Sequence, residues 1–408
     1  MSTKGLFGAR AAVAAMACVL AVAVVLVALA EADGAHATVP GKDSYPGKHK
    51  GHNKGGLDPS LEESLDAAFE KSFQDSGVPG AIAAVRTPDG TWVRSLGVAN
   101  KASGQPMQAD MHHRIGSVTK TFTATLLLQA AARGQISLDD TIDRYVEGIP
   151  NGDEITLRQM ADMSSGIASY TENEQFQEDL FADPEAVWTP EELARIGIKD
   201  SPLFDPGKGW HYSNTNYVLL GMVLEQVTGK PIERLYSKQI IKPLHLKETS
   251  FPNAADSSIP EPYDHGYTLQ GQSDGEPVDA TDWNPAWGWT AGGMISTVDD
   301  MLVYGRALGT GKGLLPREQQ AERLTSFLYG LPPNSPEKAY GLGLVTVGGW
   351  LGHTGTQPGF NTTVYYHPQI HTTVVVEVNN DISVGRKTPA DLIFGTLAAE
   401  LGKPSGTE

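Results

Sequence analysis

Hydrophobic and polar positions near the start of the folded chain follow first a helical and then a strand pattern. Apolar residues recur at helical spacing over 61–76, which predicts a helix. Two β-rich runs follow at 80–86 and 91–98, joined by the Thr-Pro-Asp-Gly segment 87–90. Short β-rich runs separated by turn residues predict a hairpin.

The C-terminal region offers a similar set of elements. Residues 362–366 and 372–378 form a second β-rich pair, and Pro389 opens a helix that runs to about residue 401. Both ends of the folded chain thus supply strands and a helix. The economical fold pairs these strands into one antiparallel sheet that the terminal helices flank.

The middle of the chain, from about residue 120 to 290, is long and rich in loops. Its strongest helical patterns lie at 121–133, which Gly134 stops, and at 217–228. We therefore expect an α/β protein of the α+β kind, in which a mostly helical lobe packs beside the antiparallel sheet. A ligand is expected in the cleft between the two.

The first residues read as an export signal. Lys4 and Arg10 precede an uninterrupted apolar run over 11–30, and an Ala-His-Ala cleavage pattern follows it, so 1–37 is predicted to be a signal peptide. Twenty apolar residues also suffice to span a bilayer, so an uncleaved anchor is the alternative. Residues 38–57 are predicted to be a flexible linker before a single folded domain at 58–404.

Charge and cysteine content narrow the chemistry. The net charge of −17 argues against nucleic-acid binding, because phosphates would be repelled. The single cysteine, Cys18, lies in the predicted signal, so the mature chain is expected to contain no disulfide, thiolate metal site or cysteine nucleophile. The domain is expected to be secreted, or to face outward if the anchor is kept.

The first candidate for catalysis is Ser117, which has Lys120 three residues later at the start of a strong helix. Residues at this spacing share a helix face. A serine hydroxyl needs a base to become a nucleophile, and a lysine serves when desolvation lowers its pKa. A helix-capping serine beside a surface lysine is the alternative explanation of this common pattern.

Two further motifs lie downstream. Tyr212-Ser213-Asn214 stands on a loop entering a helix, where Tyr212 can relay a proton and Asn214 can donate its amide to a substrate carbonyl. A turn with an aromatic anchor is the alternative. The third motif, Gly352-His353-Thr354-Gly355-Thr356, precedes the C-terminal strands. Its glycines permit close backbone approach to a ligand, and its N–H groups can hold an oxyanion.

Other chemistries find little support in the sequence. There is no Gly-x-Ser-x-Gly elbow, no His-Glu-x-x-His and no phosphate-binding glycine loop. Four histidines stand in two pairs, His112 with His113 and His367 with His371, but no carboxylate lies at ligand spacing. We expect neither a metal nor a cofactor.

In this order the three motifs resemble those of the penicillin-recognising serine enzymes. The combination of Tyr-Ser-Asn with His-Thr-Gly is similar to the secreted serine D-alanyl-D-alanine carboxypeptidases related to class C β-lactamases. The resemblance covers roughly residues 60–400. It implies the β-lactamase/transpeptidase-like fold, with the active site in the cleft between sheet and helical lobe.

The resemblance also implies roles for the motif residues in an acyl-serine mechanism. Lys120, neutral when it acts, would take the proton of Ser117. Tyr212 would pass a proton to the departing amine and help to activate the deacylating water. Which of Lys120 and Tyr212 is the general base stays open. Asn214 would orient the substrate amide.

The remaining implied residues would bind the substrate. The N–H groups of Ser117 and Thr356 would form an oxyanion hole, and the hydroxyls of Thr354 and Thr356 would face a terminal carboxylate. Trp287 matches an aromatic wall of the cleft, and Trp289 is the core-packing alternative.

Two departures from the family bear on the substrate. His353 stands where many relatives carry lysine, so we expect its positive charge to fade, and carboxylate binding to weaken, between roughly pH 5.5 and 8. Val345 stands where carboxypeptidases of this type can place an arginine that grips the terminal carboxylate. Peptidase activity on D-Ala-D-Ala is therefore expected to be present but weak.

The function that the resemblance implies is a secreted, penicillin-binding D-alanyl-D-alanine carboxypeptidase that acts on peptidoglycan stem peptides. The alternatives within the family are a class C-like β-lactamase, an esterase, and a D-amino-acid peptidase or amidase. Outside it, the alternative is a membrane-tethered binding protein without activity. The expected partners are peptidoglycan-type peptides and β-lactams, and the expected state is a monomer.

Overall fold

The computed structural model describes residues 57–402. The predicted signal peptide 1–37 and almost all of the predicted linker 38–57 lie outside the described residues, as do the last two positions of the predicted domain. Within the described part of the chain, no helix combines the length and the apolar character needed to cross a membrane.

An eight-stranded antiparallel sheet forms one half of the molecule. Its strand order is β3-β2-β1-β12-β11-β10-β9-β8. The strands are β1 Gly80–Arg86, β2 Thr91–Asn100, β3 Gln105–Pro106, β8 Lys338–Tyr340, β9 Val345–Val347, β10 Trp350–Gln357, β11 Phe360–His367 and β12 Thr372–Val378.

The two ends of the chain meet at the centre of this sheet. β1 pairs with β12 in antiparallel register, with Ala83 opposite Val376. Both predicted hairpins form, although β2 runs two residues beyond the predicted end and β11 begins two residues before the predicted start. The prediction that one antiparallel sheet unites the two ends is therefore confirmed.

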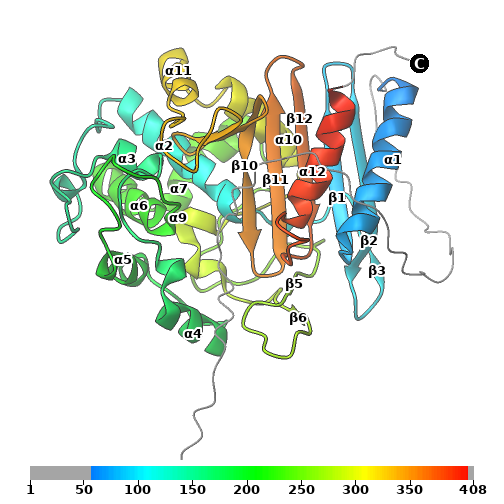
Figure 1. The fold of residues 1–408 in the computed structure, drawn as a ribbon, viewed down its shortest axis with the longest axis horizontal. Helices are drawn as coiled ribbons and strands as arrows, with labels where there is room; N and C mark the ends of the chain where they lie inside the picture. The colour runs from blue at the N-terminus through cyan, green and yellow to red at the C-terminus, as the bar shows by residue number, and fades with distance from the viewer. Residues whose placement is uncertain (1–56, 403–408) are drawn as a thin grey trace, which may run out of the picture.

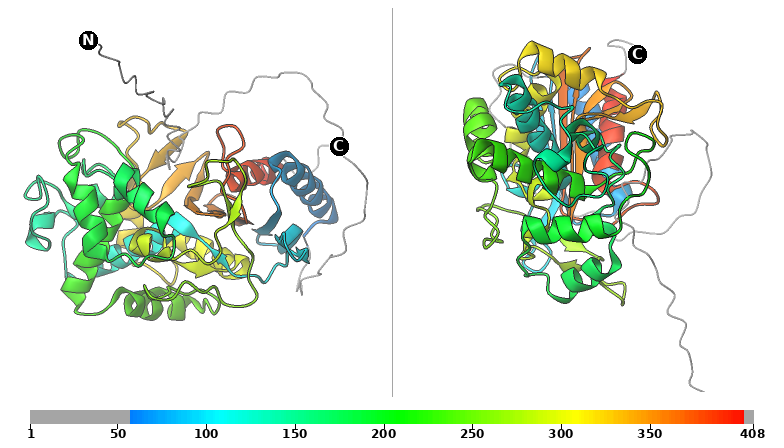
Figure 2. Two further views of the ribbon diagram at one scale, coloured as in Figure 1. Left: turned by 90° about the horizontal axis from the view of Figure 1, so that it is seen from below. Right: turned by 90° about the vertical axis from the view of Figure 1, so that its left-hand side faces the viewer.

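Helices cover both faces of the sheet. On one face α1 Pro59–Ser76 and α12 Pro389–Leu401 pack side by side (Figures 1 and 2), and the ring of Tyr365 on β11 packs at a tilt against Phe394 of α12. On the other face, Val364 and Tyr366 of β11 lie against glycines of α10 Val298–Thr310. Neighbouring residues of one strand thus support different layers, as strand geometry requires.

The middle of the chain forms the predicted helical lobe, seen on the left in Figure 1. At its centre lies α2 Thr119–Ala132, in which every residue from 119 to 130 is buried. The other helices are α3 Leu157–Ala161, α4 Glu174–Ala182, α5 Pro190–Lys199, α6 Asn214–Thr228, α7 Ile232–Tyr236, α8 Lys242–Leu244, α9 Trp289–Gly292 and α11 Arg317–Thr325. Two short strand pairs lie outside the large sheet: β4 His113–Arg114 with β7 Ile295–Ser296, and β5 Tyr267–Thr268 with β6 Val278–Asp279.

Candidate active site

Ser117 lies in a 3-10 turn, Gly116–Val118, that leads directly into α2. Gly116 has a φ of 49°, and a Cβ atom there would sit 2.6 Å from the backbone N of Thr356 on β10. A Cβ atom at Gly355 would sit 3.0 Å from the backbone N of Ser117. Two glycines therefore let this turn pack directly against β10. The contact brings together the N–H groups of Ser117 and Thr356, the pair expected to form an oxyanion hole.

Lys120 is fully buried one turn along α2 from Ser117. Its Nζ donates hydrogen bonds to Ser117 Oγ at 2.9 Å and to the carbonyl oxygen of Ala291 at 2.7 Å. The ring faces of Tyr212 and Tyr217 lie 4.9 and 5.7 Å from the same nitrogen. Burial lowers the pKa of Lys120 well below its usual value. A neutral amine in this position can accept the proton of Ser117.

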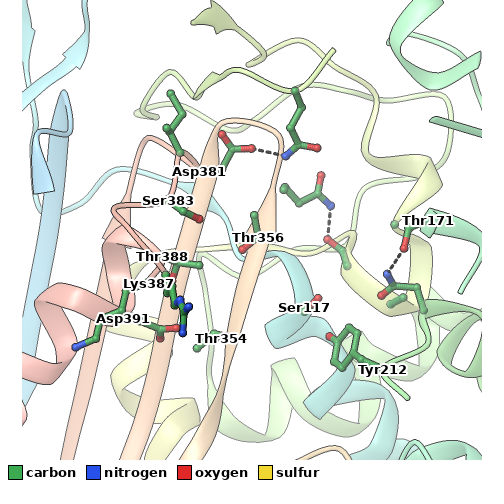
Figure 3. Close-up of a pocket in the computed structure, with 18 of the residues that line it drawn as sticks. Ser117, Thr171, Tyr212, Thr354, Thr356, Asp381, Ser383, Lys387, Thr388 and Asp391 are labelled. Atoms are coloured by element: carbon green, nitrogen blue, oxygen red, sulfur yellow. Dashed lines mark hydrogen bonds between the residues drawn. The ribbon is translucent and has the colours of Figure 1, made fainter. Parts of the chain in front are cut away.

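Tyr212 lies beside the nucleophile, and Figure 3 shows the two side chains together at one end of the cavity. Among the described residues, its buried hydroxyl meets no partner at full hydrogen-bond geometry. Burial raises the pKa of Tyr212, and the nearby Ser117 hydroxyl offsets the rise only in part. The tyrosine therefore keeps its proton at neutral pH. Because the pKa of Lys120 is lowered and that of Tyr212 is raised, the structure favours Lys120 as the base and Tyr212 as the proton donor.

Asn214 is fixed by contacts at the start of α6. Its backbone N–H donates to Ser169 Oγ at 3.1 Å, and its Nδ2 donates to Thr171 Oγ1 at 2.9 Å. The next residue, Thr215, donates through its hydroxyl to the carbonyl oxygen of Ala168 at 2.7 Å. These bonds hold the Tyr-Ser-Asn segment against the loop before α4, with the amide group of Asn214 at the cavity wall.

A cavity of about 460 Å³ opens in front of Ser117. It runs across β10 toward the N-terminal end of α12, where Figure 3 places Lys387 and Asp391. Six of the predicted site residues line it: Ser117, Tyr212, Asn214, Trp287, Thr354 and Thr356. Lys120 lies buried behind Ser117, while His353 and Gly355 do not line the cavity.

The expectation of a titrating positive charge on His353 is wrong. Thr354 and Thr356 of β10 line the cavity, whereas His353 points away from it, with its ring centroid 6.3 Å from that of Tyr212. There it is buried, with Nε2 3.1 Å from the hydroxyl of Tyr340 and Nδ1 bonded to the carbonyl oxygen of Thr354. Burial is the main cause that lowers the pKa of His353, to about 3. The ring is therefore neutral across physiological pH.

Trp287 lies at the cavity, whereas Trp289 and Val345 pack away from it. Trp287 lines the cavity, and its carbonyl oxygen accepts a hydrogen bond from Tyr170. Trp289 packs instead against α6, where its ring edge faces Gly221. Val345 is only 8% exposed and belongs to the hydrophobic core, so an arginine at this position would have to leave that core to reach a ligand.

Several lining residues were not predicted from the sequence. Tyr170 and Thr171 lie beside Asn214, while a mixed group of charges surrounds the far part of the cavity: Lys338, Asp381, Arg386, Lys387 and Asp391. Burial raises the pKa of Asp381 to about 6, although Thr268 and Gln270 donate hydrogen bonds to it. Three of these charged residues, Asp381, Arg386 and Lys387, come from the segment between β12 and α12, which carries no recognisable motif and could be found only from the fold.

Comparisons with known proteins show what the chain is similar to. A family model described as Beta-lactamase matches residues 65–398. A Bacillus subtilis protein named as a penicillin-binding protein, PbpX, is 26% identical over 279 residues, which are 67% of this chain and 63% of that protein. The chain therefore spans slightly less than two thirds of the length of this relative.

Two solved structures are informative. A D-stereospecific amidohydrolase from Streptomyces is 35% identical, with a TM-score of 0.72, covering 78% of this chain and 94% of that one. An octameric penicillin-binding protein homologue from Pyrococcus abyssi is 27% identical, with a TM-score of 0.70, covering 84% of this chain and 77% of that one.

Proposed function

This chain belongs to the β-lactamase family of serine hydrolases, and from that premise we propose that it is a D-stereospecific amide hydrolase acting through an acyl-serine intermediate. The 35% identity to the Streptomyces amidohydrolase, over nearly the whole of that chain, supports the reaction class. The observation that carries the choice is the neutral, inward-facing His353, because it leaves the Thr354–Thr356 segment without a fixed positive charge beside the scissile bond.

In the proposed acylation step, neutral Lys120 takes the proton of the Ser117 hydroxyl, and Oγ attacks the substrate carbonyl carbon. The negative oxygen that forms is stabilised by the N–H groups of Ser117 and Thr356. Tyr212 then donates its proton to the amide nitrogen as the C–N bond breaks. The amine leaves with that proton, and the proton taken by Lys120 returns to Tyr212.

Deacylation follows the same path in reverse order, with water in place of the amine. Tyr212 and Lys120 together remove one proton from the attacking water, whose oxygen bonds to the acyl carbon. Collapse of the second tetrahedral intermediate breaks the ester bond to Ser117 Oγ, which regains a proton from Lys120. Asn214, fixed by Thr171, donates its amide to the acyl part of the substrate throughout.

A D-alanyl-D-alanine carboxypeptidase is the second candidate. The specific observation in its favour is that Lys338, Arg386 and Lys387 line the far part of the cavity, where they can meet a carboxylate. Asp381 and Asp391 line the same region and favour a substrate with a free amino group instead. Both candidates form an acyl-enzyme from a D-residue, and they differ in the group that leaves.

The test compares four substrates on purified protein: D-phenylalanine amide, L-phenylalanine amide, a peptide ending in D-Ala-D-Ala and the same peptide with a C-terminal amide. We expect kcat/KM to be at least about 100-fold higher for the D-amide than for the L-amide, because the fixed oxyanion hole and Asn214 leave one productive orientation. Ser117→Ala is the inactive control. A strong preference for the peptide with the free carboxylate would favour the carboxypeptidase, and equal rates on D- and L-amides would contradict the proposal.

We also propose that the protein is exported, with cleavage after residue 37, and that it is a monomer. The proposal of export rests on the N-terminal pattern of Lys4, Arg10 and the apolar run that follows. Mass spectrometry of the protein from the culture medium would reveal the mature N-terminus. Light scattering would separate a monomer from an octamer like that of the Pyrococcus relative.

A further inference from the structure

A second cavity, of about 430 Å³, lies in the helical lobe at the C-terminal end of α2. Four of its lining residues are cations, Arg133, Lys230, Arg234 and Lys238, and none is acidic. We call it the basic groove. Arg133 is sixteen residues beyond Ser117 along α2, which corresponds to roughly 24 Å of helix, so the groove is separate from the active-site cavity.

The cations of the basic groove have no acidic partners. Lys230, Arg234 and Lys238 are exposed, and none of the ion pairs within residues 57–402 involves any of the four. This is unexpected in a chain with 48 acidic and 31 basic residues. Glu225 lies on the neighbouring α6, but its pKa is raised by burial and by other carboxylates, so no cation of the groove offsets it.

Arg133 is held in place within the groove. Its Nε donates to Gln135 Oε1 at 2.9 Å, and its Nη2 donates to Gln239 Oε1 at 2.7 Å. Because both acceptors are neutral amides, the guanidinium keeps its full charge. Two of its five N–H groups are used, and three remain for a ligand.

The helix dipoles explain only half of this cluster. Arg133 and Lys230 follow the C-terminal ends of α2 and α6, where a cation stabilises the exposed carbonyl groups. Arg234 and Lys238 lie four residues apart on α7 and the π-helical turn Ser237–Ile241, which continue directly into α8, so neither stands at a free C-terminal end. Residues at that spacing share a helix face, so two like charges are held together at a cost that a bound anion would offset.

We propose that the basic groove binds a phosphate-type oxyanion carried by a small organic group. A doubly charged phosphate presents several oxygens to converging donors, and an arginine fork suits this geometry. The cavity is larger than a single phosphate ion needs, which leaves room for the group that carries it. Because the whole protein is strongly acidic, attraction is confined to the groove, and we expect binding to weaken as salt is raised.

The test measures binding of pyrophosphate and glycerol phosphate to the full chain by calorimetry at low salt. We expect saturable binding to the wild type and at least a tenfold weaker Kd for Arg234→Gln/Lys238→Gln. The matched control, Lys71→Gln/Arg306→Gln, removes the same charge from exposed positions on α1 and α10 and should bind like the wild type. Lys230→Gln is an independent single variant, and unfolding midpoints check that all four proteins fold.

A second arm uses vesicles of phosphatidylglycerol in phosphatidylcholine, with pure phosphatidylcholine as reference. If the wild type sediments with the anionic vesicles and the groove variant does not, a lipid headgroup is the source of the phosphate. Binding of the soluble phosphates alone would identify a free ligand. The proposal is overturned if no probe binds the wild type saturably, or if the groove variant and the control bind alike. Neither measurement depends on amide hydrolysis, so failure of the phosphate-binding proposal would leave the proposed function unaffected.

Discussion

The two ends of helix α2 each carry a basic side chain, in opposite surroundings. Lys120, at the N-terminal end, is fully buried and bonded to Ser117. Arg133, just beyond the C-terminal end, is exposed and bonded to two neutral amides. Desolvation makes the lysine a base, while hydration keeps the arginine a cation. Burial in the fold therefore determines which chemistry each of the two basic residues can perform.

The same contrast holds for the glycines at the two ends. Gly116 and Gly134 both have a positive φ, of 49° and 65°. A Cβ atom at Gly116 would meet the backbone of Thr356, whereas at Gly134 it would find nothing within 4 Å. The positive φ favours glycine at both ends. Only at the catalytic end does the absence of a Cβ atom also allow close packing.

Removing the amine of Lys120 should have the largest effect. We expect Lys120→Met to lower kcat/KM on a D-amino-acid amide by about 10³- to 10⁴-fold, because the base that activates Ser117 is lost. Arg133→Met at the other end is the matched control and should stay within about twofold. Steady-state rates and the rate of penicillin acylation followed by mass spectrometry would measure both. A Lys120→Met protein with a tenth of wild-type activity would refute the assignment of the base.

Gly116→Ala should come next in size. The new Cβ would force the turn that carries Ser117 away from β10, and a shift of this kind costs on the order of 100-fold in rate. The positive φ adds about 1 to 2 kcal/mol of strain. We expect both lower kcat/KM and a lower unfolding midpoint. If activity survived while stability fell, the contact with Thr356 would serve packing alone.

The terminal strands and the catalytic motifs could be predicted because their signals are local. Runs such as 80–86 and 372–378 carry their own β-rich pattern, and Ser117 and Lys120 are neighbours on one helix. The expectation for His353 used the pKa of a free imidazole. Burial of the ring lowers that pKa to about 3, and the depth of burial depends on contacts such as that with Tyr340, which no short pattern in the sequence records.

The far part of the cavity could not be predicted in the same way. Asp381 follows β12, Asp391 lies in the first turn of α12, and Lys338 begins β8. They come together only in the folded sheet, where β8 lies on one side of β10 and β12, which leads into α12, lies on the other. No short pattern records a contact of that kind. The charges that discriminate between substrates are therefore known only from the folded chain.

The buried imidazole of His353 gives a smaller, pH-dependent test. Because the pKa of His353 lies near 3, the ring does not change charge between roughly pH 5.5 and 8. We expect His353→Gln to lower kcat/KM by less than about tenfold, the value of one or two neutral hydrogen bonds. The shape of its pH profile should match the wild type. Burial raises the pKa of Asp381, which lines the cavity, to about 6, so we expect an inflection near pH 6 to persist in this variant. Its loss in His353→Gln would show that the imidazole titrates after all.

Gly134→Ala should have the smallest effect, confined to stability. The left-handed conformation costs an alanine about 1 to 2 kcal/mol, and with open space around the new methyl group no steric term is added. We expect the unfolding midpoint to fall by a few degrees while kcat/KM stays within about twofold, because the change lies roughly 24 Å along α2 from Ser117. Calorimetry and rates on the same preparation would measure both. A large loss of activity would mean that strain at one end of α2 moves the other, and the two ends could then no longer be treated as independent sites.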